Sequence, residues 1–149
     1  AGDVAIRSTF IVGFPGETDE QYQKLYDFIG EYKLNYAGFF AYSKEDGTAA
    51  AKLKNQIPQA VKNKRLKNIT ALQSKVIFEN NKNYVGKTLK VLYEGIDYDN
   101  NIFYGRPEFC APDVDAKVLF SSDNLVNVGN FYDVKITGAN GYDLVGEVK

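Results

Sequence analysis

The sequence contains no histidine and no methionine, and it has a single cysteine, Cys110. Without histidine, neither a Ser-His-Asp triad nor a Cys-His pair can be assembled from these residues. A zinc site built from the usual histidine and cysteine ligands is excluded on the same ground, and one cysteine cannot form an internal disulfide. We therefore expect no catalytic residue and no metal ligand in this chain, and no catalysis by the chain alone.

Long apolar runs are missing as well. No stretch approaches the roughly 20 consecutive apolar residues that a transmembrane helix needs, and the chain does not open with the charged and apolar regions of a secretory signal. Together with the single cysteine, these features predict a cytoplasmic protein that does not bind membranes. Because no methionine starts the chain and a strand pattern follows at once, we expect a piece of a longer protein.

The first third of the chain follows a strand, helix, strand order. Residues 4–13 are rich in β-formers and apolar towards their end, which predicts a strand covered on both faces, as in a parallel sheet. Thr18 and Gln21 have the spacing of a capping box at a helix start. The apolar face of that helix is expected to contain Tyr22, Leu25, Phe28, Ile29 and Tyr32. With a second strand at 37–43, the segment predicts a βαβ unit.

A long helix is predicted from Pro58 onward. It is expected to fade in ENNKN, residues 79–83, which divides the chain into domains 1–83 and 84–149. Its apolar stripe is formed by Val61, Leu66, Ile69, Leu72, Val76 and Ile77. The basic residues Lys62, Lys64, Arg65, Lys67 and Lys75 are expected mostly outside that stripe.

Beyond the long helix the hydrophobic period changes to two. About five short strands are separated by turn residues, with the strongest hairpin signal at Asn140-Gly141, which predicts a small all-β, OB-like barrel. Its aromatic residues could stack nucleic-acid bases, but their alternating spacing favours a place for most of them in the barrel core. They are Phe103, Tyr104, Phe109, Phe120, Phe131, Tyr132 and Tyr142.

The two halves carry opposite net charge. Residues 1–83 hold 12 basic and 9 acidic residues, a net charge of +3, whereas residues 84–149 hold 6 and 10, a net charge of −4. An acidic barrel is a poor general nucleic-acid binder, because phosphate neutralisation needs cations. Within it, Arg106 either presents its guanidinium to an anion or forms an ordinary surface salt bridge, and Cys110 is expected to be a structural thiol.

The stretch GFPGET, residues 13–18, ends the first predicted strand. Gly13 and Gly16 permit positive φ and close backbone approach, and Pro15 stiffens the turn. Ligands of parallel α/β sheets lie at the carboxyl ends of the strands, and Tyr42 and Ser43 end the second strand at the same level. The alternative is a tight strand-to-helix turn without a ligand.

Taken in order, several segments resemble the radical S-adenosylmethionine methylthiotransferases. The matching runs are RSTFIVGFPGETDEQY, FFAYSKEDGTAAAKL, the helix with Arg65, Leu72 and Gln73, and a C-terminal part that opens with YVGKTLKVL and closes with ITGANGYDLVGE. The resemblance implies an α/β remnant of a radical-SAM partial TIM-like barrel, with a βαβ unit and a long helix. A TRAM domain would follow as an OB-like five-stranded barrel.

Within this family, the run GRPEFCAPDVDAKV is similar to the pattern GR…DAPEIDG of the RimO type, which modifies an aspartate of small-subunit ribosomal protein twelve. Ala111, Pro112, Asp113 and Asp115 match, whereas Cys110 replaces an Asp and Ala116 a Gly. An acidic barrel also suits a basic protein substrate and repels tRNA. The alternatives are the tRNA adenosine methylthiotransferases (MiaB-like) and a non-enzymatic RNA-binding module, so tRNA is the less favoured partner.

The resemblance also implies cofactors and sites. The family cleaves S-adenosylmethionine with a 4Fe-4S cluster held by a CxxxCxxC motif and uses a second 4Fe-4S cluster as the sulfur source; neither set of cysteines is present here. One wall of the adenosylmethionine site would be formed by Ile11, Gly13, Phe14, Pro15, Gly16, Phe40 and Tyr42. Substrate contacts would fall to Arg106, Asp113, Asp115 and Tyr142 of the barrel.

Overall fold

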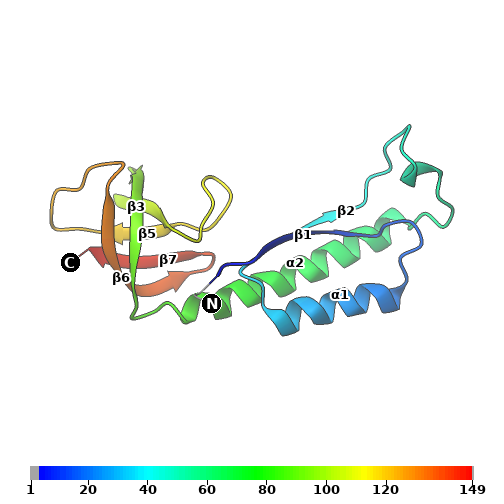
Figure 1. The fold of residues 1–149 in the computed structure, drawn as a ribbon, viewed down its shortest axis with the longest axis horizontal. Helices are drawn as coiled ribbons and strands as arrows, with labels where there is room; N and C mark the ends of the chain where they lie inside the picture. The colour runs from blue at the N-terminus through cyan, green and yellow to red at the C-terminus, as the bar shows by residue number, and fades with distance from the viewer. Residues whose placement is uncertain (1–3, 149) are drawn as a thin grey trace. The chain divides into compact units, whose positions relative to one another are not determined.

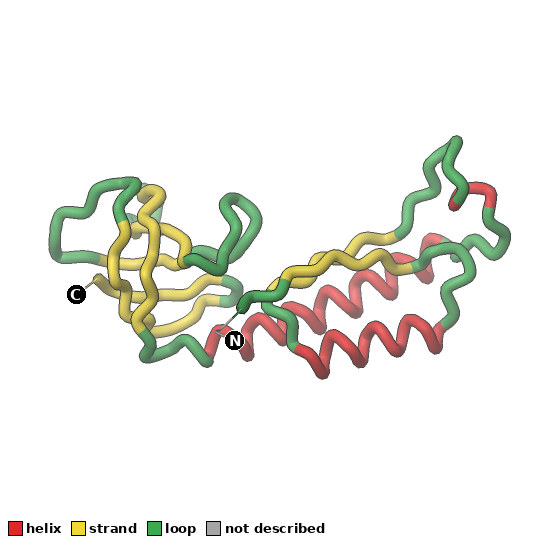
Figure 2. Tube along the Cα trace, viewed as in Figure 1, coloured by secondary structure: helices red, strands yellow, loops and turns green. Residues whose placement is uncertain are grey.

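The computed structural model describes residues 4–148, which form two compact units (Figures 1 and 2). One comprises residues 5–76; the other comprises residues 77–148 together with Val4. The division falls within the helix α2, Gln59–Lys82. Each unit has its own hydrophobic core.

The first unit is the predicted βαβ unit. Strand β1 (Arg7–Val12) is followed by helix α1 (Asp19–Tyr32) and strand β2 (Tyr36–Ala41), and the strands pair in parallel with Phe10 opposite Phe39. A short 3₁₀ turn, η1 (Ala50–Lys52), and α2 complete it. The expected strands, 4–13 and 37–43, are both longer than the observed ones.

Only one face of the β1–β2 sheet is covered in the described chain. On the covered face, Val12 packs with Ile29 of α1 and Ile69 of α2, and Phe10 and Phe39 stack beside them. Figure 1 shows α1 and α2 on the same side of the two strands. Burial alternates along β1, as it does in a strand with one solvated face. The expectation that residues 4–13 form a strand covered on both faces is therefore wrong for this chain.

Helix α1 begins as predicted. The Thr18 hydroxyl accepts a hydrogen bond from the Gln21 N–H, and the Gln21 side chain accepts one from the Thr18 N–H, so the capping box is complete. Ile29 is fully buried, and Tyr22 and Leu25 pack against the same core. Phe28 and Tyr32, also expected on this apolar face, are exposed, so the expectation is wrong for them.

Helix α2 ends at Lys82, inside the predicted segment 79–83, and the buried Asn81 amide near this end donates to the carbonyls of Gly141 and Tyr142. The helix departs from its predicted pattern at two basic residues. Lys62 and Arg65, expected outside the apolar stripe, are 7% and 6% exposed. Their long aliphatic stems lie along the buried face while their charged ends find polar partners.

The second unit contains a closed five-stranded barrel, in the order β3-β4-β5-β7-β6. The strands are β3 (Thr88–Asp97), β4 (Ile102–Pro107), β5 (Val118–Ser121), β6 (Phe131–Asn140) and β7 (Asp143–Val148). The pairs are antiparallel except for β5 with β7. The register shifts by one residue between Tyr93 and Gly95 and between Ile136 and Gly138, and such bulges help a small sheet to close.

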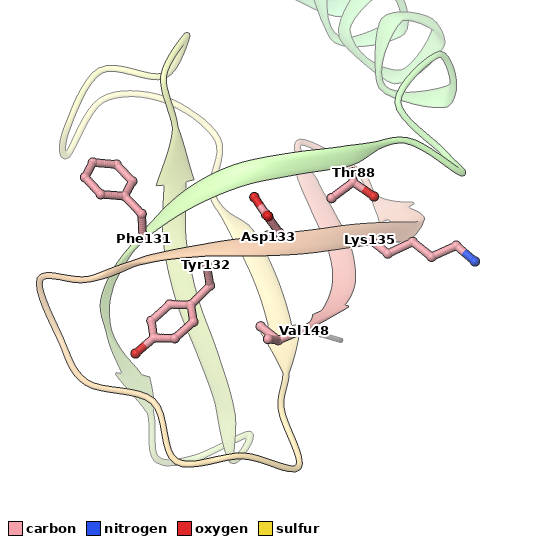
Figure 3. Close-up of a pocket in the computed structure, with 6 residues that line it drawn as sticks. All are labelled: Thr88, Phe131, Tyr132, Asp133, Lys135 and Val148. Carbon is pink, nitrogen blue, oxygen red and sulfur yellow. The ribbon is translucent and has the colours of Figure 1, made fainter.

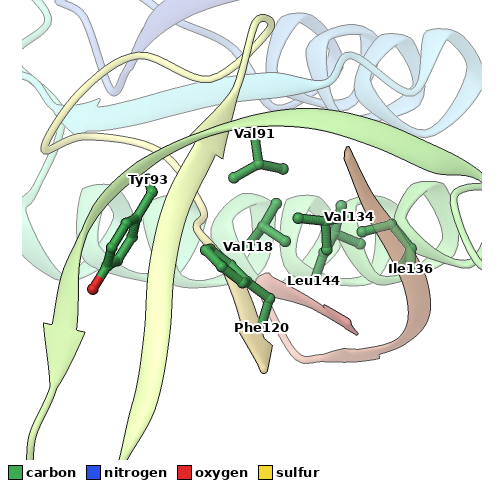
Figure 4. Close-up of a cluster of buried hydrophobic side chains, with 7 residues drawn as sticks. All are labelled: Val91, Tyr93, Val118, Phe120, Val134, Ile136 and Leu144. Atoms are coloured by element: carbon green, nitrogen blue, oxygen red, sulfur yellow. The ribbon is translucent and has the colours of Figure 1, made fainter. Parts of the chain in front are cut away.

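The barrel core contains seven buried side chains from all strands except β4 (Figure 4): Val91, Tyr93, Val118, Phe120, Val134, Ile136 and Leu144. Of the seven aromatic residues considered above, Phe120 is fully buried, and Phe103 and Tyr132 pack against this core. Phe131 and Tyr142 are exposed, so the expectation of a core position fails for them.

The predicted hairpin joins β6 to β7. Asn140 is opposite Asp143, so Gly141 and Tyr142 are the two turn residues, and Gly141 has the positive φ, 64°, that such a turn requires. The predicted hairpin is therefore confirmed, although its two turn residues begin one position after Asn140.

Candidate functional site

The carboxyl ends of β1 and β2 bring the seven predicted cofactor residues to one end of the first unit. Ile11 is the register partner of Phe40, and the Tyr42 N–H donates to the carbonyl of Val12. In the loop that follows β1, the ring of Phe14 contacts that of Tyr42 edge-on, with 5.3 Å between centroids. The predicted set is therefore spatially contiguous, although its members lie in different environments.

The second face of the β1–β2 sheet is exposed in the described chain, and we call it the open face. It is formed by two pairs of exposed residues on neighbouring strands, Thr9 with Gly38 and Ile11 with Phe40. Ile11 is 55% and Phe40 62% exposed, which is unusual for neighbouring large apolar side chains in a strand pair. A flat, apolar group such as a purine ring could bury this surface.

Gly13 and Gly16 differ in the space around them. Both have positive φ, 75° and 88°. A Cβ on Gly13 would collide with the side chain of Lys62, so the close approach at this strand end is to α2. A Cβ on Gly16 would meet nothing within 4 Å, and its N–H donates to the carbonyl of Asn55. The space that a ligand could use therefore lies beside Gly16 and Phe14.

Tyr42 is less accessible than its neighbours. It is 9% exposed, and its ring is covered by Phe14 and by the Lys62 amino group, which lies 5.4 Å from the ring centroid. Its hydroxyl is buried and forms no hydrogen bond within the described chain. A ligand would reach this ring only after Phe14, which is half-exposed, moves aside.

Two buried cations of α2 lie behind the loop. The Lys62 amino group donates to the Tyr42 carbonyl at 2.8 Å. Arg65 pairs with Glu17 at 2.5 Å and with Asp19 at 2.6 Å. Burial would lower the pKa of Arg65, but the hydrogen bond that Arg65 donates to Asp19 and the charge of Glu17 outweigh burial, so the pKa is raised. Glu17 also accepts the Gly13 N–H at 2.9 Å. Sequence reasoning missed both cations, although Lys62, Arg65 and Ile69 follow a helical period.

On the barrel, three of the four predicted substrate residues surround one groove of about 210 Å³: Arg106, Asp113 and Asp115. Glu94 and Lys117 also line it. Arg106 forms an ion pair with Glu94 at 2.7 Å, so the salt-bridge alternative describes it. The Asp115 carboxylate accepts the Ala111 N–H at 2.7 Å and shapes the loop.

Asp113 lines this groove, whereas Tyr142 lies apart from it. Asp113 is exposed at a positive φ of 60°. Tyr142 does not line the groove but occupies the β6–β7 turn. Cys110 is buried, as expected of a structural thiol.

A second groove on the barrel was not predicted. It has a volume of about 450 Å³ and is lined by Thr88 of β3, by Val148 of β7 and by Phe131, Tyr132, Asp133 and Lys135 of β6 (Figure 3). Phe131 is 63% exposed at the start of β6. The signal that could have located it is the aromatic pair Phe131-Tyr132, since adjacent strand residues point to opposite faces and only one can enter the core.

An iron–sulfur cluster does not fit the residues of this chain. Fe–S clusters are held by several cysteine thiolates, and the sequence has one cysteine. Within residues 4–148, no group of three or more His, Cys, Asp and Glu residues could hold a metal ion. Among the described helices, none is long and apolar enough to cross a membrane.

Comparison with known proteins relates the whole chain to one group. Residues 85–148 match the TRAM domain. Proteins named "Ribosomal protein uS12 methylthiotransferase RimO" are 43% identical in Elusimicrobium minutum, over 97% of this chain and 32% of that protein, and 47% identical in Alkaliphilus oremlandii, over 98% and 34%. The protein of that name from Chlamydia abortus is 43% identical over 97% of this chain and 32% of its own length.

The chain spans about a third of the length of these relatives. The identity extends over both compact units, since 97% or more of the chain is aligned, and it agrees with the TRAM match in the barrel. Over nearly its whole length, this chain is therefore similar to part of the RimO-type methylthiotransferases, and its barrel matches the TRAM domain.

Proposed function

We propose that this chain is part of a radical S-adenosylmethionine enzyme that methylthiolates the β-carbon of an aspartate in small-subunit ribosomal protein twelve, in the cytoplasm. The observation that carries the proposal is the identity of 40–47% over nearly the whole chain to proteins named for that activity. The iron-ligating cysteines would come from the rest of the longer protein, so the chain alone would be inactive.

The first unit would contribute one wall of the adenosylmethionine site. Ile11 and Phe40 on the open face fit the adenine ring, because they are exposed, apolar and adjacent. Phe14, Pro15 and Gly16 would border the same ligand, with Gly13 and Tyr42 behind them. When bound and reductively cleaved, adenosylmethionine supplies a carbon radical that abstracts hydrogen; the residues of this chain bind and orient the cofactor and keep water from it.

The TRAM barrel would dock the substrate protein. Residues 84–149 carry a net charge of −4, which attracts a strongly basic protein and repels tRNA phosphates. In the groove beside Arg106, that guanidinium is already paired with Glu94, so Asp113 and Asp115 supply the carboxylates for basic residues of the substrate. Tyr142, exposed in the β6–β7 turn, would extend this contact.

Binding of the 149-residue chain to purified ribosomal protein twelve tests this proposal. We expect micromolar or tighter binding that weakens as salt rises, because exposed charges are screened. Asp113→Asn should weaken binding roughly 2- to 5-fold, the effect of one exposed ion pair. Asp123→Asn removes the same charge from another exposed position and serves as the control.

Two outcomes would contradict the proposed docking. If the chain shows no salt-sensitive binding to the ribosomal protein at micromolar concentration, the barrel does not dock that protein. A gel shift with tRNA, without binding to the ribosomal protein, would favour the tRNA-modifying branch or an RNA-binding module instead.

A further inference from the structure

One side chain, Lys62 of α2, contacts the ends of both strands. Its methylene stem occupies the space that a Cβ on Gly13 would need, directly after β1. Its amino group donates to the carbonyl of Tyr42, directly after β2, at 2.8 Å. The residue is 7% exposed. Lys62 thus joins two backbone positions that are 29 residues apart in the sequence but adjacent at the carboxyl edge of the sheet.

Filling this space with a buried ammonium group is energetically unfavourable. Among the described residues no carboxylate pairs with Lys62, and its amino group has one hydrogen-bond acceptor and the face of the Tyr42 ring. Burying a charge without a counter-charge is costly, and an apolar side chain of similar length would fill the same gap without that cost. Stability alone therefore does not explain a lysine at this position. A role in holding the Tyr42 carbonyl in place does explain it.

Arg65, one turn further along α2, acts on the same loop from its other end. It pairs with Glu17, whose carboxylate accepts the Gly13 N–H, so Gly13 is held through its N–H by the Arg65–Glu17 pair and against its Cα by Lys62. The loop backbone from Gly13 to Glu17 is thereby fixed from α2 without any ligand present. Prior fixing of a loop lowers the conformational cost of ligand binding.

We infer that Lys62 is a positioning residue for the adenosylmethionine site. It does not touch the ligand; it holds the backbone at Gly13 and Tyr42 so that Phe14 and Gly16 on one strand end, and Phe40 on the other, face the ligand at a fixed separation. The identity of the ligand rests on the proposed function. The role of Lys62 in holding the two strand ends rests on its contacts with Gly13 and Tyr42.

The test compares Lys62→Met with Lys64→Met. The first variant keeps a long stem beside Gly13 but removes the ammonium; the second removes an exposed ammonium two residues along the same helix. In the 149-residue chain, amide exchange by NMR should become about 10-fold faster or more at Gly13 and Tyr42 in Lys62→Met, the loss expected for one charge-assisted hydrogen bond. The unfolding midpoint should not fall.

In the longer protein, equilibrium dialysis should show that Lys62→Met raises the dissociation constant of S-adenosylmethionine by about 10-fold, again the effect of one such bond. Lys64→Met should leave both readouts at the wild-type value. A dissociation constant within about twofold of wild type for Lys62→Met, or equal weakening by the two variants, overturns the inference.

The proposed function has a separate point of failure. If the wild-type longer protein does not bind S-adenosylmethionine, the proposed function is wrong, and Lys62 does not position a site for that ligand. The exchange measurement on the 149-residue chain still decides whether Lys62 holds the strand ends.

Discussion

The Arg65 guanidinium lies 2.5 Å from a carboxylate oxygen of Glu17, and both side chains are withdrawn from solvent. Removing one member of a buried ion pair leaves the other uncompensated, which typically costs about 3–5 kcal/mol. We therefore expect Arg65→Met to lower the free energy of unfolding of the first unit by that amount, measured by urea denaturation.

A matched control is available on α1. Lys24 and Glu20 form an exposed i, i+4 pair 3.8 Å apart. Lys24→Met should cost less than about 1 kcal/mol, as exposed pairs do. Equal costs for the two variants would mean that the Arg65–Glu17 pair is solvated in solution and does not hold the loop.

Two glycines of the barrel should respond differently to alanine. A Cβ on Gly105 of β4 would collide with the Leu92 carbonyl of the neighbouring strand, whereas a Cβ on Gly138 of β6 would meet nothing within 4 Å. Gly105→Ala should destabilise the barrel by roughly 1–3 kcal/mol through overpacking, and Gly138→Ala should change stability by less than about 0.5 kcal/mol. The same small effect for both would contradict the tight β3–β4 approach.

Tyr93 should make the barrel sensitive to alkaline pH. Burial, followed by the neighbouring Tyr98 and Tyr132, raises the pKa of Tyr93 above 10.0. The unfolded chain then releases the tyrosine proton at a lower pH than the folded one, so the stabilising contribution is complete below pH 10 and is lost as the pH rises through the folded-state pKa.

Denaturation at a series of pH values would measure this effect. The unfolding free energy should fall more steeply above pH 10 in the wild type than in Tyr93→Phe, which has no proton to lose. Parallel pH profiles for the two proteins would show that Tyr93 titrates normally.

The β1–β2 sheet should be the less stable part of the chain. It has two strands, so each has an unpaired outer edge, and its open face exposes Ile11 and Phe40. We expect amides of residues 1–56 to exchange faster than those of the closed barrel, unless the edges pair with another copy. Equally slow exchange at a low, monomeric protein concentration would contradict this prediction.

Local signals predicted much of the fold. The capping box at Thr18, the change of hydrophobic period after α2 and the turn near Asn140 depend on neighbouring residues, and each is confirmed. Helix α2 also ends within the predicted segment, at Lys82, but the hydrogen bonds of Asn81 could not be predicted, because its acceptor carbonyls lie 60 or more residues away in the sequence.

The candidate site was predicted less completely, for a physical reason. A hydrophobicity pattern treats Lys62 and Arg65 as surface residues, although their stems are apolar and their charges bind backbone and carboxylate oxygen. The signal that was available is phase: Lys62, Arg65, Ile69, Gln73 and Val76 recur at intervals of three or four residues, and all five are buried. Their partners, Tyr42 and Glu17, could only be found in the structure.

Mass spectrometry of the product is the most direct test of the central proposal. The longer protein, with its clusters loaded, would be incubated with S-adenosylmethionine, a reductant and purified ribosomal protein twelve, alongside a parallel sample of tRNA. The account predicts a methylthio group on the β-carbon of one aspartate of the ribosomal protein and unmodified tRNA. A methylthiolated tRNA adenosine, with the ribosomal protein unchanged, would contradict it.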